Sequence, residues 1–140
     1  MTMNAMIWLT GQDYSRLKHI LAEHMRQSRT MQTELETLEE ILDVARVVRP
    51  EMVPGNVVTM NSRVLFRDLR TDDADTVTIV YPADADSSAG RISVLSPVGA
   101  ALLGEAEGKE VELPLPRRQT RRIRILSVLY QPEAQGDFAL

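Results

Sequence analysis

The chain contains no cysteine, which excludes disulfide bonds, thiolate chemistry and cysteine-based zinc sites. Aromatic residues make up only 4% of its 140 residues, so an aromatic-lined pocket has few candidate residues. No apolar run approaches the roughly 20 residues of a membrane span. The first residues, MTMNAMIWLTG, lack the basic region and long apolar core of a secretory signal. We therefore expect a cytoplasmic protein with no membrane partner.

The chain also lacks an excess of positive charge. It has 20 acidic and 16 basic residues, and its formal net charge is -4. Proteins that bind nucleic acid through its phosphates are usually basic, so we expect no specific nucleic-acid partner. Hydrophobic residues make up 44% and charged residues 26%, which is typical of a folded chain with one ordinary domain or a small domain and an appendage.

Glycine and proline are almost absent from the first 50 residues, where only Gly11 and Pro50 occur. The other six glycines and six prolines lie beyond residue 50. Because these residues mark turns, the first part is predicted to be helical and the second to consist of strands and turns. The sequence therefore predicts an α+β fold with an N-terminal unit at 1–50 and a C-terminal unit at 51–140.

Two helices are expected in the N-terminal unit. Thr10 to Asp13 is typical of a helix N-cap with an acid in the first turn, and an apolar face follows at steps of three or four residues. The second helix carries a heptad seam of Met31, Leu35, Leu38, Leu42 and Ala45. We predict a short antiparallel helical hairpin, a coiled coil that reverses at 26–30. One continuous helix of about 35 residues is the alternative, and its length of roughly 50 Å would require a partner.

The C-terminal unit is predicted to be an antiparallel sheet with one short helix. The expected strands span 57–60, 64–67, 76–81, 91–95, 109–113 and 121–130. In the last strand the apolar alternation changes parity between Ile125 and Leu126, which indicates a β-bulge or burial on both faces. Ser96 is predicted to cap a short helix that starts at Pro97, and Gly104 to end it.

The segment ISVLSPVGAALLGEAEGKEVELPLP, residues 92–116, resembles the C-terminal domain of the GreA and GreB transcript-cleavage factors. That family has the same order of strand, Ser-Pro, short helix and glycine. Three further stretches, 57–69, 80–88 and 130–140, resemble the Gre-related Rnk family, the regulators of nucleoside diphosphate kinase. The resemblance covers about residues 50–140. It implies an FKBP-like C-terminal domain, a short coiled coil, and binding to RNA polymerase at the rim of its secondary channel.

The resemblance also implies which residues contact the polymerase. Leu95, Ser96 and Pro97 match the loop that touches the polymerase in Gre factors. Proteins similar to GreB have an acid where this chain has Leu95, so an apolar contact is expected here. The same residues are also explained as a fold signature of cap, first turn and close packing, and the two explanations are compatible.

In Gre factors, acidic residues at the coiled-coil tip help to hold a catalytic metal ion in the polymerase. The corresponding tip here is predicted at Arg26, Gln27, Ser28 and Arg29, which include no carboxylate. Guanidinium groups cannot coordinate Mg²⁺. We therefore predict a regulator that competes with Gre factors and does not stimulate transcript cleavage, with a cleavage-stimulating factor as an alternative.

The densest charge cluster is the basic patch of Arg117, Arg118, Arg121 and Arg122. It is predicted either to be a solvated hairpin face or to bind phosphates or an acidic protein.

His19 and His24 lie about 140° apart on a helix, so no metal site or other cofactor is expected. The FKBP-like fold leaves a prolyl isomerase as the enzyme alternative, although two Phe, three Tyr and one Trp offer little for an aromatic proline pocket. A monomer is expected, because the hairpin buries its own seam.

Overall fold

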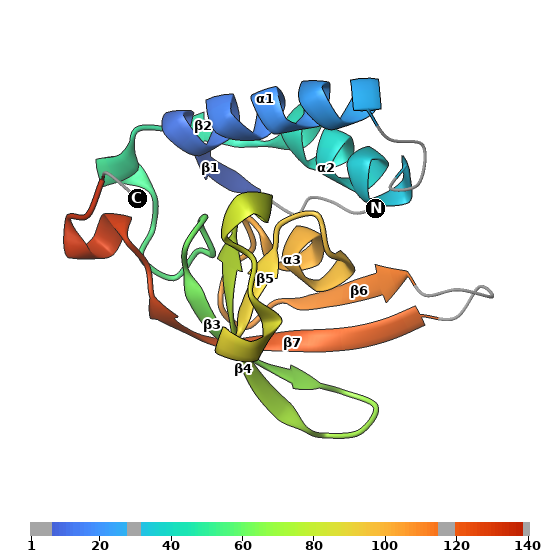
Figure 1. Cartoon of the computed structure of the whole chain (residues 1–140). Helices are drawn as coiled ribbons and strands as arrows, with labels where there is room; N and C mark the ends of the chain where they lie inside the picture. The colour runs from blue at the N-terminus through green and yellow to red at the C-terminus, as the bar shows by residue number, and fades with distance from the viewer. Residues whose placement is uncertain (1–6, 28–31, 115–119, 139–140) are drawn as a thin grey trace.

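The computed structural model describes residues 7–27, 32–114 and 120–138. A pair of helices lies along one side of the molecule, a five-stranded sheet forms the other side, and a short helix lies between them (Figure 1). This arrangement confirms the α+β class.

Helices α1 (Gly11–Gln27) and α2 (Gln32–Val44) run antiparallel and pack against each other (Figure 1). The Thr10 hydroxyl oxygen accepts a hydrogen bond of 3.1 Å from the Asp13 backbone N–H, which confirms the predicted N-cap. The apolar faces of both helices are buried, at Leu17, Leu35, Leu38 and Leu42. The predicted helical hairpin is therefore observed, and the single continuous helix is not.

The N-terminal unit also contains a small two-stranded sheet in addition to the two expected helices. Strands β1 (Trp8–Thr10) and β2 (Arg46–Val48) pair in parallel at the base of the hairpin. The heptad seam was expected to continue to Ala45, but α2 ends at Val44. The β-branched Val47 and Val48 favour extended backbone, and Arg49 precedes a proline, so the helix gives way to a strand here.

The main sheet has the strand order β5-β4-β3-β7-β6. Its strands are β3 (Arg63–Asp68), β4 (Ala74–Val80), β5 (Arg91–Ser93), β6 (Glu110–Pro114) and β7 (Thr120–Tyr130). The prediction of a wholly antiparallel sheet is wrong at one edge, because β4 and β5 pair in parallel. Two short 3-10 helices, η2 (Pro82–Asp84) and η3 (Ser87–Ala89), return the chain so that β5 runs in the same direction as β4.

The expected strand at 57–60 is not a strand beyond an isolated bridge between Val57 and Ala106. Val57 and Val58 are both buried, whereas a half-buried strand would alternate. The backbone N–H of Val58 donates to the carbonyl of Glu105, and its carbonyl accepts from Gly104. The segment is therefore held by the turn that follows the short helix rather than by a neighbouring strand.

The parity change in the last strand is a β-bulge, the first of the two alternatives predicted for it. Leu65 pairs with Ser127 and Phe66 pairs with Ile125, so Leu126 is the extra residue on β7. The bulge allows both halves of this long strand to keep apolar residues on the covered face of the sheet.

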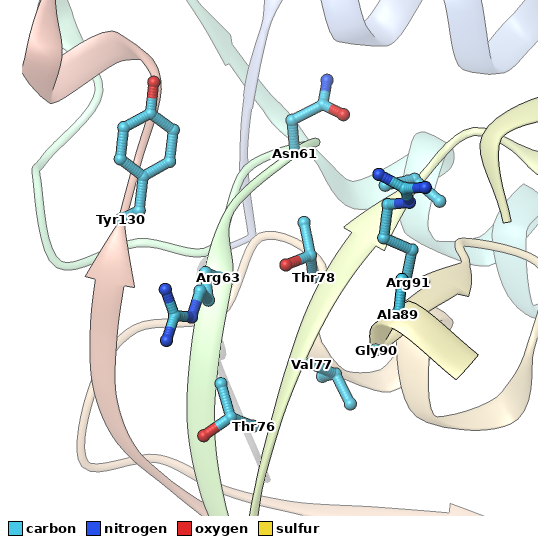
Figure 2. A pocket seen from close by; sticks show the side chains of 10 residues that line it. Asn61, Arg63, Thr76, Val77, Thr78, Ala89, Gly90, Arg91 and Tyr130 are labelled. Atoms are coloured by element: carbon cyan, nitrogen blue, oxygen red, sulfur yellow. The ribbon is translucent and has the colours of Figure 1, made fainter. Parts of the chain in front are cut away.

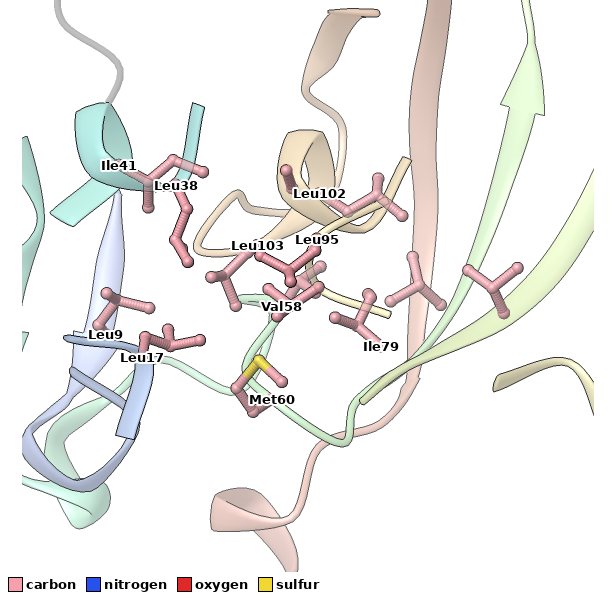
Figure 3. Close-up of a cluster of buried hydrophobic side chains, with 14 of the residues drawn as sticks. Leu9, Leu17, Leu38, Ile41, Val58, Met60, Ile79, Leu95, Leu102 and Leu103 are labelled. Atoms are coloured by element: carbon pink, nitrogen blue, oxygen red, sulfur yellow. The ribbon is translucent and has the colours of Figure 1, made fainter. Parts of the chain in front are cut away.

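One hydrophobic core joins the helical hairpin to the sheet (Figure 3). It is built from α1 and α2, the 57–60 segment, the sheet and the short helix α3 (Pro97–Leu102). Members from the different parts include Leu9, Leu17, Leu38, Ile41, Val58, Met60, Ile79, Leu95, Leu102 and Leu103. The division into units at residue 50 stays a prediction, and the two units pack through this shared core.

Candidate functional site

Three local hydrogen bonds hold the loop before α3 in place. The Ser96 hydroxyl donates to the Ser93 carbonyl at 2.7 Å and accepts from the Gly99 backbone N–H at 3.1 Å, so Ser96 is the predicted N-cap. The Leu95 backbone N–H donates to the Ser93 hydroxyl at 3.0 Å. Pro97 follows at the first helical position and is exposed. The loop therefore presents the Pro97 ring on a fixed backbone.

Leu95 does not belong to this exposed surface. Its side chain is 1% exposed and lies in the hydrophobic core. Val94 is also fully buried, because the chain turns inward after the short strand β5. The expectation of an apolar contact through Leu95 is therefore wrong, and Ser96 and Pro97 are the members of the predicted contact set that reach the surface.

Close packing and backbone conformation require glycine at two positions of this motif, Gly99 and Gly104. A Cβ atom on Gly99 would lie 2.3 Å from the Ser93 carbonyl oxygen, so the helix could not approach the loop with any other residue. Gly104 has φ of +80°, and a Cβ there would lie 2.3 Å from the Ile7 side chain. The motif thus serves the packing of α3 as well as the exposure of Pro97.

A hollow lies beside α3, between α2 and strand β6. Ala101, one helical turn after Pro97, lines it together with Val44 and Val111. Val44 is 64% exposed. Glu40 and Glu105 also line it, and burial raises the pKa of Glu105. The exposed side of α3 therefore continues into a hollow that is lined by apolar and acidic side chains.

The predicted hairpin tip is only partly described. Arg26 and Gln27 lie in the last turn of α1, whereas Ser28 and Arg29 fall outside the described residues. Helix α1 has 17 residues, which corresponds to roughly 25 Å. The hairpin is thus short, in agreement with the prediction from the sequence.

The basic patch, like the hairpin tip, is only partly described by the structure. Arg117 and Arg118 fall outside the described residues. Arg121 donates to Asp68 at 2.5 Å, and Arg122 lies 3.6 Å from Glu112 on the neighbouring strand. Backbone N–H groups, chiefly that of Arg70, and the Arg121 guanidinium lower the pKa of Asp68. The two described arginines are therefore engaged within the sheet, which favours the prediction of a solvated hairpin face.

A buried polar cluster links α1 to the sheet, and the sequence alone indicated only its helix-capping part. Asp13 is 3% exposed. Its carboxylate accepts from the Tyr81 hydroxyl at 2.9 Å and from the Met60 backbone N–H at 3.2 Å. Burial raises the pKa of Asp13 to about 6, and burial together with the nearby carboxylate raises that of Tyr81. This cluster fixes the start of the hairpin against the C-terminal unit.

The described residues show no metal cluster. His24 contacts the carbonyl of Ile20, and His19 lies 3.6 Å from Glu23, so the two histidines face different partners. Within the described ranges no three His, Asp or Glu side chains come together in a way that could hold an ion. None of the helices in those ranges is long and apolar enough to cross a bilayer.

A second hollow lies on the open face of the sheet, over β3, β4 and the start of β5 (Figure 2). Tyr130 is the one aromatic residue that lines it, and its other walls mix Val80 and Ala89 with threonine, asparagine and arginine residues. An aromatic, apolar proline pocket of the kind that a prolyl isomerase needs is therefore not formed by this hollow.

Comparisons with known proteins identify a family match that includes the α3 motif. The family described as "Transcription elongation factor, GreA/GreB, C-term" matches residues 53–130. The chain therefore belongs to this family of transcription factors, whose members are regulators rather than catalysts.

A more particular similarity is to the regulator of nucleoside diphosphate kinase of Escherichia coli strain K12. The two chains are 44% identical over 105 residues, which cover 75% of this chain and 77% of that protein. Both predicted resemblances, to the Gre factors and to the Rnk family, are thereby confirmed.

Two further relatives define how far the similarity extends. Transcription elongation factor GreA of Oenococcus oeni is 36% identical over 91 residues, which cover 65% of this chain and 56% of that protein. The chain thus spans about half the length of this GreA relative. A solved structure of a prokaryotic transcription elongation factor GreA/GreB from Nitrosomonas europaea is 40% identical, with a TM-score of 0.72, and covers 91% of this chain and 100% of that one.

Proposed function

We propose that this protein is a cytoplasmic transcription regulator that binds RNA polymerase as a monomer, docks at the rim of the secondary channel, and competes with Gre factors without stimulating transcript cleavage. The observation that carries the proposal is a C-terminal unit of the GreA/GreB family that follows a short helical hairpin. The residues between the two helices of this hairpin include no carboxylate.

The first argument concerns what the hairpin turn could do. The sequence from Arg26 to Thr33, RQSRTMQT, contains two arginines and no acid. Mg²⁺ requires oxygen ligands, and carboxylates supply both the oxygens and the compensating charge. A turn without carboxylates cannot add a negatively charged oxygen ligand to a metal ion in the polymerase. The short α1, at roughly 25 Å, also limits how far the turn reaches from a docking point on the C-terminal unit.

The second argument concerns the docking point. Pro97 is exposed on a loop that three hydrogen bonds hold in place, so little conformational entropy is lost when it is buried by a partner. Ala101 continues the same face of α3 into the hollow beside α2. These features support a contact surface of Ser96, Pro97 and the outer face of α3.

A competition experiment tests the proposal directly. Labelled protein is titrated with core RNA polymerase, and unlabelled GreA is then added as competitor. We expect saturable binding that GreA reverses. In parallel, backtracked transcription complexes receive either protein, and we expect cleavage with GreA alone. Absence of binding would overturn the docking proposal, whereas cleavage by this protein would support the alternative of a cleavage-stimulating factor.

A pair of proline substitutions locates the contact. Pro97→Ala removes the exposed ring and keeps a residue that is compatible with a helix start, so we expect polymerase affinity to fall about tenfold, as for a central contact residue. Pro50→Ala is the matched control, because Pro50 begins a 3-10 helix (η1, Pro50–Met52) elsewhere on the molecule. Equal affinity of the two variants would show that the polymerase does not bind at this loop.

A further inference from the structure

The open face of the main sheet carries a transverse row of four polar side chains. Strand register places Arg91 of β5 beside Thr78 of β4, Thr78 beside Arg63 of β3, and Arg63 beside Tyr130 of β7. Residues in register share one face of a sheet. Arg63 and Arg91 are exposed and Thr78 and Tyr130 are half-buried, whereas the neighbouring Val64, Val77 and Ile79 are buried on the other face.

This row lines the hollow described above, and Figure 2 shows the two guanidinium groups on opposite sides of Thr78. Neighbouring strands lie about 4.8 Å apart, so the Cα atoms of Arg63 and Arg91 are separated by about 10 Å. Arginine side chains are long enough to meet a ligand between them from both sides. Thr76 and Asn61 add a hydroxyl and an amide to the lining.

The charge of this hollow differs from that of the chain as a whole. The protein has a net charge of -4, yet the lining of the hollow contains two arginines and no carboxylate. The carboxylate of Asp86 lies 3.7 Å from the guanidinium group of Arg91. Asp86 already accepts from the backbone N–H and the hydroxyl of Ser88, at 3.1 and 2.6 Å, so it holds Arg91 only loosely.

Arg63 is the exceptional arginine of this face. Three other arginines of the open face each make an ion pair with a carboxylate. The pairs are Arg67 with Asp72, Arg122 with Glu112, and Arg124 with Glu110. Among the residues that the structure describes, Arg63 makes no ion pair and no side-chain hydrogen bond. Its charge is therefore available to a ligand.

We propose that this hollow is a binding site for a phosphate-bearing anion, held by the guanidinium groups of Arg63 and Arg91 with the hydroxyl of Thr78 between them. Guanidinium groups form paired, charge-assisted hydrogen bonds with phosphate oxygens. A phosphate presents several oxygens in different directions, which suits two cations on opposite sides and a hydroxyl donor in the middle. A carboxylate has only two oxygens and would satisfy one arginine. This site is independent of the proposed polymerase contact, because it lies on the sheet face and not on α3.

The phosphate could come from a small molecule or from a nucleic-acid strand, and the experiment separates these sources. Inorganic pyrophosphate is titrated into the full chain at constant ionic strength, and backbone amide shifts are followed by NMR. We expect saturable shifts at millimolar or lower concentration, confined to residues around Thr78, Gly90 and Arg91. A single-stranded oligonucleotide without a terminal phosphate is titrated in parallel. Binding of pyrophosphate at the hollow supports the small-molecule source, and binding of the oligonucleotide across the same residues supports the strand.

Two arginines on one strand provide a matched pair of variants. Arg63→Gln removes the unpaired guanidinium, and we expect the dissociation constant for pyrophosphate to rise about tenfold, the loss of one charge-assisted contact. Arg67→Gln lies on the same face of β3 but outside the hollow and should leave the constant unchanged. Both positions are exposed, so neither variant should unfold.

Three outcomes would overturn the proposal. The first is the absence of shifts with both probes. The second is an equal loss of affinity in Arg63→Gln and Arg67→Gln, which would indicate attraction to general positive charge. The third is shifts confined to Arg117, Arg118 and their neighbours in the sequence. None of these results bears on polymerase binding, which is measured separately.

Discussion

The two faces of the main sheet are built from the same strands but carry different side chains, apolar on one face and charged on the other. On β3, Val64 and Phe66 point into the core, and the alternate residues Arg63 and Arg67 point to solvent. The covered face is continuous with the hairpin and α3 through one hydrophobic core. The open face carries arginines that are mostly matched by carboxylates on neighbouring strands or turns.

The difference shows which face of the sheet stabilises the fold. Burial of apolar side chains is the dominant favourable contribution to folding, whereas exposed ion pairs contribute about 0 to 1 kcal/mol each. The open face can therefore change its charges without loss of the fold. The covered face cannot change in this way, and Asp13, a buried carboxylate at its boundary with the hairpin, is held by specific donors.

The largest effect is expected from breaking the covered face. Ile79 is fully buried, and Ile79→Ala should lower the free energy of unfolding by about 2 to 5 kcal/mol, because it removes apolar contact and leaves a cavity. Urea unfolding measures this change. Thr78→Val, at the next position on the open face, keeps the shape of the side chain and should change the same quantity by about 0.5 kcal/mol or less. Similar losses at both positions would contradict the assignment of the two faces.

An intermediate effect is expected at Asp13 and depends on pH. Its folded-state pKa is raised from 3.8 to about 6, so between these values the folded protein binds more protons than the unfolded chain. This contribution to the free energy of unfolding is therefore greatest at low pH and falls as pH rises from about 4 to about 6, by about 2 to 3 kcal/mol. The difference between wild type and Asp13→Asn in urea unfolding at several pH values isolates it.

Tyr81→Phe sharpens the same measurement. The Tyr81 hydroxyl donates to the charged form of Asp13 and lowers its pKa against the effect of burial. Without this hydroxyl the fall in stability should extend to higher pH. A profile that is the same in wild type, Asp13→Asn and Tyr81→Phe would mean that Asp13 is not a buried titrating group.

The smallest effect is expected on the open face. Arg122 and Glu112 are register partners on β7 and β6, with side chains that are 61% and 58% exposed. Arg122→Gln should change the free energy of unfolding by less than about 0.5 kcal/mol at physiological salt, because solvent and ions screen the pair. A loss comparable to that of Ile79→Ala would show that the open face contributes to stability as well as to charge.

Local chemistry explains which structural predictions were correct. The Thr10 and Ser96 caps, the proline at the start of α3 and the turn at Gly104 each depend on a few adjacent residues. The parity change at Ile125 and Leu126 is likewise visible in the letters, because side-chain direction alternates along a strand. The α3 motif and its family resemblance could likewise be recognised from neighbouring residues in the sequence.

Long-range pairing explains which predictions were incomplete. Nothing near Arg91 indicates whether its strand pairs in parallel with β4, and the pairing of β1 with β2 joins segments separated by the whole hairpin. The burial of Leu95 depends on where the core lies beyond the loop.

The sequence by itself determined the two helices, most of the strands, the capped Ser-Pro helix and the absence of acid at the hairpin turn, because each depends on neighbours along the chain. Only the tertiary structure decided that Leu95 is buried and Pro97 exposed. It also decided that Asp13 meets Tyr81 and that Arg63 and Arg91 share one hollow. Each of these facts depends on residues brought together by folding, and their separation along the chain leaves no local pattern to read.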